Sequence, residues 1–376
     1  MNRQRRTLND TKTDPQYYMK RAQRVAEKAH GVCSPNPFVG AVIVKKGVVI
    51  SEGWTQEYGS DHAEIQALKK AGAKARGADL YVTLEPCSHY GKTPPCTKAI
   101  IAAGIKRVFL GITDPNPLVN GKGILQLQEA GIDVVQGIME TAITKQLECY
   151  LCRVQKQRPF VTWKVALSLD GKYSAEDGSS RWISGEKSRA YVHRLRSQTD
   201  VVLTGIGTVL GDDPMLNARL RNKCKQPLRA VLDTKLKLPE TSQIALTART
   251  YPTAVFCAKG CEKTQKAVKL REMGITIHPV KAVGDNLDLR EVLNILHQQG
   301  CYSILLECGS KLASSFFAEE LVDKCHFFYG AKILGGSKSV LSELAISTIS
   351  SAIHLRDVSY KRFDEDLLIS GYPVFP

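Results

Sequence analysis

The most informative motif is Glu85-Pro86-Cys87-Ser88-His89-Tyr90-Gly91-Lys92-Thr93-Pro94-Pro95-Cys96, taken together with His62-Ala63-Glu64 upstream. One imidazole and two thiolates form a three-ligand set for Zn²⁺, and a catalytic zinc site leaves its fourth position to water. Glu64 stands two residues after the histidine, where a carboxylate can move protons without binding the metal. The sequence therefore predicts one zinc ion per chain, held by His62, Cys87 and Cys96, with Glu64 as the catalytic residue.

The segments around these residues predict the elements that carry them. Residues 80–84 form a short apolar run typical of a strand, so Cys87 would follow at the C-terminal edge of a sheet. Cys96 would begin a helix over residues 97–103, where the helix dipole favours a thiolate. A His-x-Glu motif combined with two cysteines is typical of zinc deaminases, which hydrolyse an amine from a ring carbon of a base.

A second interpretation of the histidine motif starts from Asp61. Asp61 suits the N-cap of a helix over residues 63–71, and Glu64 three positions later would complete a capping box. In that case His62 would be an ordinary residue of the first helical turn. The two cysteines favour the zinc site, since each follows a proline that places the thiol at a turn.

The composition is that of a soluble protein with more than one domain. The 376 residues are 43% apolar and 24% charged, and a chain of this length usually folds as two or three domains. We find no apolar run near the roughly 18 residues of a membrane span, and no apolar signal segment follows the N-terminal arginines. Eleven cysteines, an odd number, indicate free thiols in a reducing compartment. We therefore expect a cytoplasmic protein without membrane contact.

Two α/β domains are predicted, with the junction at residues 156–159, a short polar stretch that ends in proline. The first would span residues 1–156, with 1–14 disordered, and the second residues 157–376. Helices and strands alternate in both, which is typical of helices packed against a sheet. The predicted helices are 15–30, 63–71, 97–103, 122–130, 186–197, 289–297 and 311–321. The predicted strands are 38–43, 48–53, 80–84, 107–111, 132–135, 160–165, 201–204, 230–232, 254–257, 304–306 and 326–329, followed by an antiparallel pair, 353–360 and 366–369.

The loop between the two cysteines separates the classes of deaminase. A two-residue spacing is usual in deaminases of nucleic acids and nucleosides, whereas this longer loop carries His89, Lys92 and Thr93. These side chains suit a phosphate or another polar part of a small substrate beside the metal. The net charge of +15 would also suit nucleic acid, but the basic residues are scattered and form no stripe. A nucleic-acid partner is therefore not expected.

Three motifs of the first part resemble the bifunctional riboflavin-biosynthesis enzymes of bacteria. They are His62-Ala63-Glu64, the stretch from Glu85 to Cys96, and Pro35-Asn36-Pro37-Phe38-Val39-Gly40. The longer cysteine loop is specific to that family among deaminases. The resemblance runs from about residue 17 to the C-terminus and implies a cytidine-deaminase-like α/β/α fold for the first domain. It also implies that the deaminase substrate contacts Asn36, His89, Lys92 and Thr93, although Asn36 is equally a natural turn residue between two prolines.

Glycine-rich turns occur in the second part without a dinucleotide-binding fingerprint. Residues 205–211 follow a predicted strand, yet their glycines do not fit G-x-G-x-x-G, and no acidic residue follows a second strand at the usual distance. The turn at Gly309 opens a predicted helix with small residues, which is a good place for a phosphate group.

Four further motifs, residues 164–172, 181–184, 212–214 and 307–309, resemble the reductase part of the same enzymes. That part is similar in fold to dihydrofolate reductase and uses NADPH. The resemblance implies that NADPH contacts Ala166, Trp182, Thr208, Asp212, Gly309, Ser310, Lys311, Leu312, Ala313, Ser314 and Ser315. It implies that the reductase substrate contacts Ser180, Arg196, Leu216, Arg219 and Glu307, where arginines suit a phosphate because they bind it bidentately. Lys164 and Asp212 are the candidate proton donors.

The implied chemistry is two consecutive reactions on a small phosphorylated pyrimidine. A zinc-dependent hydrolase would deaminate 2,5-diamino-6-ribosylamino-4(3H)-pyrimidinone 5′-phosphate, and an NADPH-dependent oxidoreductase would reduce the ribosyl group of the product to ribityl. The family also implies a homo-oligomer, a dimer or a tetramer. Two alternatives stay open, a nucleic-acid or nucleoside deaminase with an accessory domain, and a zinc-stabilised binding protein. Three ligands argue against the latter, because structural zinc sites normally close with four.

Overall fold

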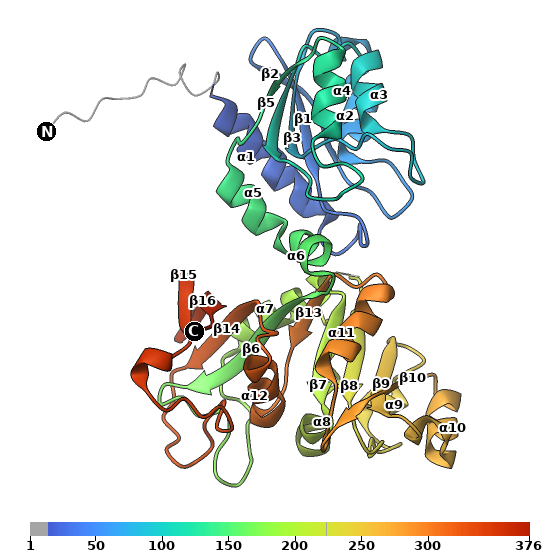
Figure 1. The fold of residues 1–376 in the computed structure, drawn as a ribbon. Helices are drawn as coiled ribbons and strands as arrows, with labels where there is room; N and C mark the ends of the chain where they lie inside the picture. Colours follow the sequence, from blue (N-terminus) through green and yellow to red (C-terminus); the bar gives the residue numbers. More distant parts are fainter. Residues whose placement is uncertain (1–13, 223) are drawn as a thin grey trace, which may run out of the picture. The chain divides into compact units, whose positions relative to one another are not determined.

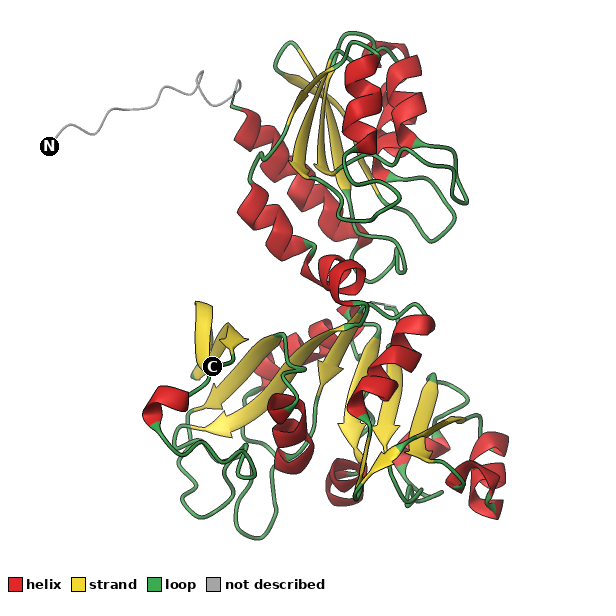
Figure 2. Cartoon of the chain, viewed as in Figure 1, coloured by secondary structure: helices red, strands yellow, loops and turns green. Residues whose placement is uncertain are grey.

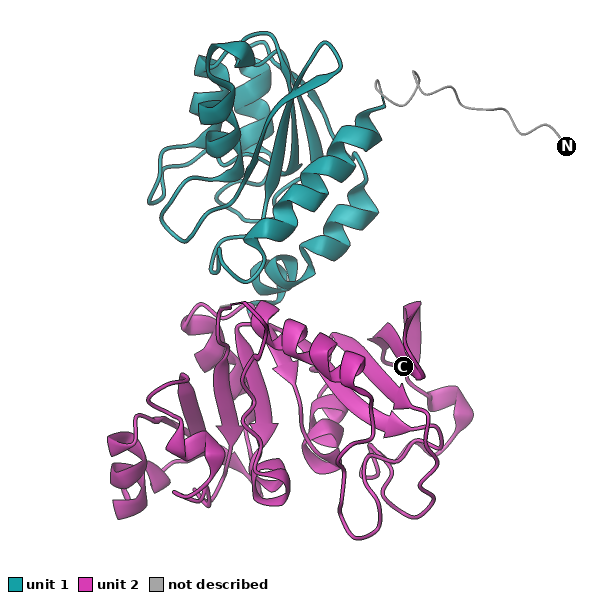
Figure 3. Cartoon of the chain, turned by 180° about the vertical axis from the view of Figure 1, so that it is seen from behind, with its two compact units in different colours: residues 1–157 teal, residues 158–376 magenta. Residues whose placement is uncertain are grey.

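A computed structural model gives the fold of residues 14–222 and 224–376 (Figure 1). The expectation of disorder over residues 1–14 therefore lies outside the described residues except at Asp14, whose side chain caps the first helix. The chain divides into two compact units between Gln157 and Arg158, called unit 1 and unit 2 below (Figure 3). In the part that the structure describes, no helix is long and apolar enough to cross a membrane.

Unit 1 is built on a five-stranded sheet with the order β2-β1-β3-β4-β5. Its strands are drawn in yellow in Figure 2. β1 pairs antiparallel with β2 and β3, whereas β3, β4 and β5 run parallel. Lys46 and Gly47 form the turn between the first two strands, and both have the positive φ that a two-residue hairpin requires. The strands are β1 (Gly40–Lys45), β2 (Val48–Trp54), β3 (Asp79–Leu84), β4 (Arg107–Ile112) and β5 (Asp133–Val135).

Helices cover both faces of this sheet (Figure 1). One face carries α1 (Pro15–Ala26) and α5 (Glu140–Gln146), the other carries α2 (Ala63–Ala71), α3 (Cys96–Ala102) and α4 (Lys122–Glu129), and α6 (Glu148–Lys156) precedes the junction. A Cβ at Gly40 would lie 2.0 Å from the Ala22 carbonyl oxygen of α1. A Cβ at Gly53 would lie 2.1 Å from the Ala63 carbonyl oxygen of α2. Both helices therefore rest directly on strand backbone, one on each face.

Unit 2 is built on a nine-stranded sheet with the order β10-β9-β8-β7-β13-β6-β14-β16-β15. The strands from β10 to β14 in this order run parallel, and β16 and β15 add an antiparallel pair. β10 and β15 are its two edges. The strands are β6 (Phe160–Ser168), β7 (Val201–Gly205), β8 (Leu228–Leu232), β9 (Thr253–Ala258), β10 (Thr276–Val280), β13 (Ser303–Leu306), β14 (Lys324–Gly330), β15 (His354–Phe363) and β16 (Asp366–Val374), with a small hairpin of β11 (Ala282–Val283) and β12 (Asn286–Leu287).

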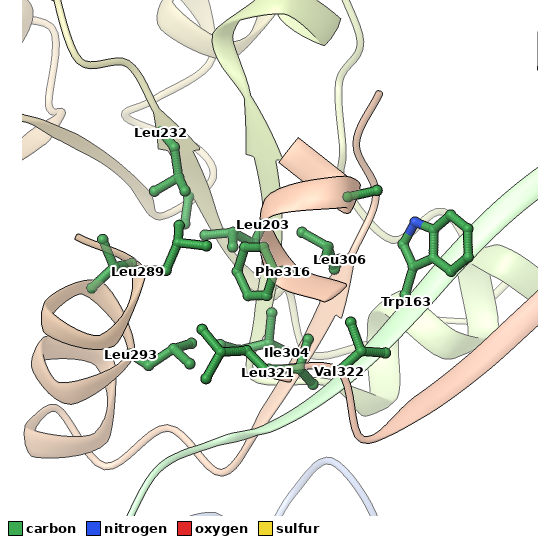
Figure 4. Close-up of a cluster of buried hydrophobic side chains, with 14 of the residues drawn as sticks. Trp163, Leu203, Leu232, Leu289, Leu293, Ile304, Leu306, Phe316, Leu321 and Val322 are labelled. Atoms are coloured by element: carbon green, nitrogen blue, oxygen red, sulfur yellow. The ribbon is translucent and has the colours of Figure 1, made fainter. Parts of the chain in front are cut away.

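Two apolar clusters fill the two faces of this sheet. The larger cluster includes Trp163 and Phe316 and lies under α11 (Leu289–Gln298) and α12 (Ser310–Ala318), as Figure 4 shows. The other includes Val231 and Ile244 and lies under α8 (Ile206–Asp212), α9 (Gln243–Leu246) and α10 (Gln265–Glu272). α7 (Glu186–Gln198) packs through Val192 against Phe328 of β14. Burial on both faces explains why the parallel strands are continuous apolar runs.

The predicted α/β fold class is confirmed in both units, including the final antiparallel pair. The predicted first helix is too long, because α1 ends at Ala26 and a short 3₁₀ turn follows. Sequence reasoning missed α8, α9, α10 and β10, and also the small hairpin of β11 and β12. All eleven cysteines lie within the described residues, and no disulfide bond links any two of them.

Candidate active sites

Three potential metal ligands meet beside the sheet of unit 1. His62 Nδ1 lies 3.6 Å from Cys87 Sγ and 3.3 Å from Cys96 Sγ. The ligand atoms of the three residues all lie within 4.8 Å of one another. With Zn–S of about 2.3 Å and Zn–N of about 2.0 Å, neighbouring ligand atoms of a tetrahedral site are about 3.5 Å apart. The donor set and its spacing therefore fit Zn²⁺.

Each of the three ligands stands at the end of a regular element. Cys87 follows β3 after a short turn, and Cys96 is the first residue of α3. The Cys96 backbone N–H donates to Cys87 Sγ over 3.3 Å, which joins the two thiols. His62 is the N-cap of α2, where the backbone is extended. Its side chain and that of Glu64 can therefore face one point, which regular helical spacing would prevent.

The capping-box interpretation of Asp61 is wrong. α2 begins at Ala63 with His62 as its N-cap, and within residues 14–222 and 224–376 no side-chain hydrogen bond caps it. The Asp61 carboxylate instead accepts from Lys69 Nζ at 2.9 and 2.7 Å. Asp61 therefore forms an ion pair with the last turn of α2 and does not cap the helix, and the His62 side chain belongs to the cluster of potential metal ligands.

Hydrogen bonds within the cluster set the protonation of the ligands. The hydrogen bond with Cys96 lowers the pKa of the Cys87 thiol to about 4, and the bond with His62 adds to this against the effect of burial. The same pairing raises the pKa of Cys96. The hydrogen bond with Cys87 raises the pKa of His62. One thiolate is therefore available at neutral pH, and the thiolate is the form that binds a metal.

Glu64 is buried beside these ligands, with 4% of its surface exposed. Removal from water raises the pKa of its carboxyl to about 7, while the nearby His62 charge acts in the opposite direction. A carboxyl with a pKa near the working pH can both accept and return a proton. The structure thus brings a proton-transfer group to the three ligands.

The expected substrate residues of unit 1 lie on two loops. His89, Lys92 and Thr93 belong to the loop between the two cysteines, and Asn36 lies just before β1. Among the described residues, the buried Nδ1 of His89 has no hydrogen-bond partner. Lys92 is exposed, and its Nζ lies 4.2 Å from the centre of the Tyr58 ring. Of these groups, the exposed Lys92 ammonium is the one that the cysteine loop presents to a polar ligand.

A cavity of about 1780 Å³ opens at the C-terminal ends of the parallel strands of unit 2. Ligands of parallel sheets bind at this edge, and a single small ligand usually occupies about 300–1,000 Å³. There is room for a dinucleotide and a second small molecule. Most of the expected cofactor residues line this cavity, namely Ala166, Trp182, Thr208, Asp212, Gly309, Ser310, Lys311, Leu312 and Ser315. All five expected substrate residues line it as well, namely Ser180, Arg196, Leu216, Arg219 and Glu307.

Ala313 and Ser314 do not line this cavity, although the resemblance placed them at the cofactor. Both are buried, at 1% and 4% exposure, and Ala313 packs in the larger apolar cluster. They face inward because α12 presents only one side to the cavity, and residues three and four apart share a helix face. Gly309, Lys311 and Ser315 remain on the open side.

A buried carboxylate organises the charges in the cavity. Glu307 accepts from Arg196 Nε at 2.6 Å and from its second guanidinium nitrogen at 3.0 Å, and Lys164 Nζ lies 3.4 Å away. Burial alone would raise the pKa of Glu307, but the Arg196 and Lys164 charges outweigh it and lower the pKa to about 2. Glu307 is therefore ionised at neutral pH and fixes the orientation of Arg196.

The starts of two helices face each other across another part of the cavity. A Cβ at Gly309, the N-cap of α12, would lie 4.0 Å from Thr208 Oγ1 in α8. No side-chain hydrogen bond caps α12 among the described residues, so its first N–H groups are open to a phosphate. Asp212 at the end of α8 accepts from Ser180 Oγ at 3.2 Å. Ser180 and Asp212 thus connect the expected substrate and cofactor residues.

Sequence reasoning missed His193, which also lines the cavity. Burial and the neighbouring charges of Arg196 and Arg219 lower its pKa to about 4, so it is neutral at pH 7. Its Nδ1 lies 3.2 Å from the carbonyl oxygen of Asn217, which also accepts from Arg196 at 3.2 Å. No sequence motif identifies His193, since its role depends on neighbours that only the fold brings together.

Comparison with known proteins agrees with this geometry in both units. Residues 12–112 match the family model of the cytidine and deoxycytidylate deaminase zinc-binding region. Residues 159–369 match the model of the RibD C-terminal domain. The class of protein defined by the fold and the two sites is therefore a zinc deaminase joined to a reductase.

Relatives along the whole chain make the assignment specific. The chain is 40% identical over 360 residues to the riboflavin biosynthesis protein RibD of Bacillus amyloliquefaciens, covering 95% of this chain and 96% of that protein. It is 37% identical over 342 residues to RibD of Escherichia coli K12, covering 88% and 91%. The crystal structure of a diaminohydroxyphosphoribosylaminopyrimidine deaminase/5-amino-6-(5-phosphoribosylamino)uracil reductase from Thermotoga maritima is 36% identical, with a TM-score of 0.85 over 96% of this chain and 99% of that one. The chain belongs to the RibD family.

It is a bifunctional enzyme of riboflavin biosynthesis with a deaminase and a reductase activity. Its cofactors are zinc in the deaminase part and NADPH in the reductase part, and the His62, Cys87 and Cys96 cluster is compatible with the zinc. The match over nearly the full length supports this function over a nucleic-acid or nucleoside deaminase with an accessory domain.

Proposed function

We propose that unit 1, predicted as the deaminase domain, acts on 2,5-diamino-6-ribosylamino-4(3H)-pyrimidinone 5′-phosphate. The observation that carries this proposal is the His62, Cys87 and Cys96 cluster beside the buried Glu64. The name of the Thermotoga maritima relative supports the same substrate. Asn36, His89, Lys92 and Thr93 would hold the polar parts of the substrate, with the Lys92 ammonium suited to its phosphate.

His62, Cys87 and Cys96 would hold the zinc ion, which would lower the pKa of a water molecule enough to give hydroxide near neutral pH. Glu64 would accept one proton of the attacking water and pass it to the ring nitrogen. It would then carry the remaining hydroxyl proton of the adduct to the amino group, which leaves as ammonia while the ring carbonyl forms. Its pKa of about 7 favours both directions of transfer at neutral pH. The burial of Glu64 keeps bulk water from competing for that proton.

For unit 2, predicted as the reductase domain, we propose that NADPH and the deaminated product bind side by side in the cavity. NADPH supplies the hydride that reduces the sugar C1′, and the protein orients the two reactants. The start of α12 and Thr208 would bind the cofactor phosphates, while Arg196 and Arg219 would bind the substrate phosphate. Lys164, held by Glu307, and Asp212, held by Ser180, are the candidates to provide the proton.

The first test addresses Glu64. Glu64→Gln should retain one zinc per chain but lower deamination by about 100-fold or more, because the amide cannot transfer the proton. Ammonia release and metal analysis on the purified full chain measure both. Glu57→Gln, an exposed carboxylate of the same unit, is the control. Unchanged ammonia release by Glu64→Gln would refute the role assigned to Glu64.

The order of the two reactions is tested by mass spectrometry. The ribotide substrate incubated without NADPH should exchange an amino group for a carbonyl oxygen, and addition of NADPH should then add two hydrogens. A product reduced without prior loss of the amino group would contradict the proposed order.

The assembly is proposed on the resemblance, and the location on the odd number of cysteines, which indicates a reducing compartment. We propose a cytoplasmic homo-oligomer, a dimer or a tetramer. Light scattering on the purified chain measures the mass, and a monomer over the working concentration range would overturn this proposal.

A further inference from the structure

A buried carboxylate next to the metal ligands has no role in the mechanism above. Glu85 lies immediately before the Pro86-Cys87 turn and is 4% exposed. Its Oε2 accepts from the backbone N–H groups of Asp114 at 3.1 Å and Gly121 at 3.0 Å. Its Oε1 accepts from the N–H groups of Gly123 at 2.9 Å and Ile124 at 3.2 Å. Both oxygens are thus occupied by donors from the loop after β4 and from the first turn of α4.

α4 is pressed against the turn that carries Cys87. A Cβ at Gly123 would lie 2.2 Å from the Pro86 carbonyl oxygen and 3.0 Å from Glu85 Oε1. Only a glycine therefore allows α4 to approach Pro86 this closely. The close packing means that a displacement of α4 would be transmitted to the backbone of Pro86 and Cys87.

The same helix also contacts the segment of the second cysteine. Gln126 of α4 accepts from the hydroxyl of Thr97, the residue after Cys96, at 2.8 Å. Its side-chain nitrogen lies 3.5 Å from the carbonyl oxygen of Ser88, the residue after Cys87. α4 therefore contacts the segments of both cysteines.

We propose that Glu85 is a positioning residue for the zinc site, because its carboxylate anchors α4 against the segments of Cys87 and Cys96 and so fixes the distance between the two sulfur atoms. This inference rests on the proposed zinc site. A carboxylate carries only acceptors, which matches four N–H donors. An amide at this position would turn one acceptor into a donor in either orientation, so two of the four hydrogen bonds would be replaced by a repulsion between donors. Groups that orient metal ligands in this way commonly change metal affinity by about 10–100-fold when altered.

The test uses the full chain with Glu85→Gln, and Glu129→Gln as the matched control, since Glu129 is an exposed carboxylate on the same helix. Zinc affinity is measured by competition with a chelator, and the metal-free protein is also loaded with Co²⁺ for absorption spectroscopy. We expect Glu85→Gln to bind zinc about 10–100-fold more weakly and to show shifted thiolate-to-Co²⁺ and d–d bands. Glu129→Gln should match the wild type in both. Equal affinity and equal Co²⁺ spectra in Glu85→Gln and the wild type would overturn the proposal.

Two further measurements distinguish a local change at the zinc site from a general loss of folding. NADPH-dependent reduction of the deaminated substrate reports on unit 2 and should be unchanged in Glu85→Gln. If Glu85→Gln loses the folded unit 1, Glu85→Asp is used instead, because aspartate keeps the charge but withdraws the oxygens from their donors. Glu85→Asp should fold and bind zinc more weakly than the wild type. A folded Glu85→Asp with wild-type affinity and Co²⁺ spectrum would refute the positioning role. Failure of the wild type itself to bind zinc would instead refute the proposed function.

Discussion

Arg229 in β8 is a buried side chain that forms hydrogen bonds with several segments of unit 2. It is fully buried, and its acceptors are carbonyl and hydroxyl oxygens, among them Thr253 Oγ1 at 2.6 Å and the Met215 carbonyl at 3.1 Å. Burial lowers the pKa of Arg229 to about 10, so the guanidinium stays charged at neutral pH. The bond to Met215 fixes the segment that presents Leu216 to the cavity.

Arg229→Met should destabilise unit 2 by about 3 kcal/mol, because several buried acceptors lose their donor. The released Met215 segment should also lower reductase activity, with deamination unchanged. Urea unfolding followed by tryptophan fluorescence gives the stability, and Arg194→Met on the exposed side of α7 is the control. A loss no larger than in the control would contradict the role of Arg229.

The residues that the sequence reveals are those whose type and spacing carry the chemistry. His62, Cys87 and Cys96 were identified because few other functions need one imidazole, two thiols and an adjacent glutamate. Arg229 and Glu85 were not, since a single arginine or glutamate has many uses. Their roles come from backbone groups that only the folded chain brings to them.

At the scale of elements, α2 depends on a glycine of the strand beneath it. Gly53 in β2 lets the helix approach until the Ala63 carbonyl lies where a Cβ would be. Ala63 begins α2, and its two neighbours in sequence are the ligand His62 and the proton-transfer residue Glu64. The position of this turn therefore depends on the absence of a side chain at residue 53.

Gly53→Ala should displace the first turn of α2 and lower deaminase turnover by about 100-fold, because a shift of roughly 1 Å misplaces the reacting groups. Reduction in unit 2 should be unaffected. Val48→Ala on the same strand alters an exposed residue and serves as the control. Steady-state ammonia release at saturating zinc measures the effect, and turnover within a factor of about two of the control would show that α2 tolerates the added methyl group.

Elements with a clear hydrophobic pattern in the sequence were predicted well, and elements whose residues give conflicting signals were not. The inner parallel strands of unit 2 are apolar because both of their faces are covered, so they stand out in the sequence, whereas the edge strand β10 was missed. α8 was missed because Gly205, Gly207 and Gly211 indicate a turn by propensity, yet Val209 packs into the core and keeps the segment helical. Tertiary packing overrode local preference there.

At the scale of the whole molecule, unit 2 contains histidines that remain neutral in the folded state. His326 in β14 is 9% exposed, and its Nδ1 lies 2.8 Å from Ser370 Oγ of β16. Burial and the Lys324 charge lower the pKa of His326 to about 4. The unfolded chain takes up this proton near pH 6.5. The stability from neutral His326 is therefore complete above pH 6.5 and is lost as the pH falls toward 4.

His326→Asn should flatten this pH dependence, because asparagine keeps a polar partner for Ser370 but does not titrate. The wild type should lose at most about 3 kcal/mol more than the variant between pH 7.5 and 4. Urea unfolding of unit 2 at several pH values measures the difference, with His354→Asn on the exposed β15 as the control. Parallel pH profiles of the wild type and His326→Asn would exclude His326 as the source.

The nine-stranded sheet of unit 2 ends at β10 and β15, and both edges are poor templates for a further strand. Pro279 in β10 has no amide hydrogen to offer, and β15 carries Arg356, Lys361 and Arg362 together with a register shift between Arg356 and Ser359. An exposed edge strand without such features can pair with the edge strand of another chain and cause aggregation. The two edges of this wide sheet therefore resist strand addition, so the protein can reach a high concentration without self-association of this kind.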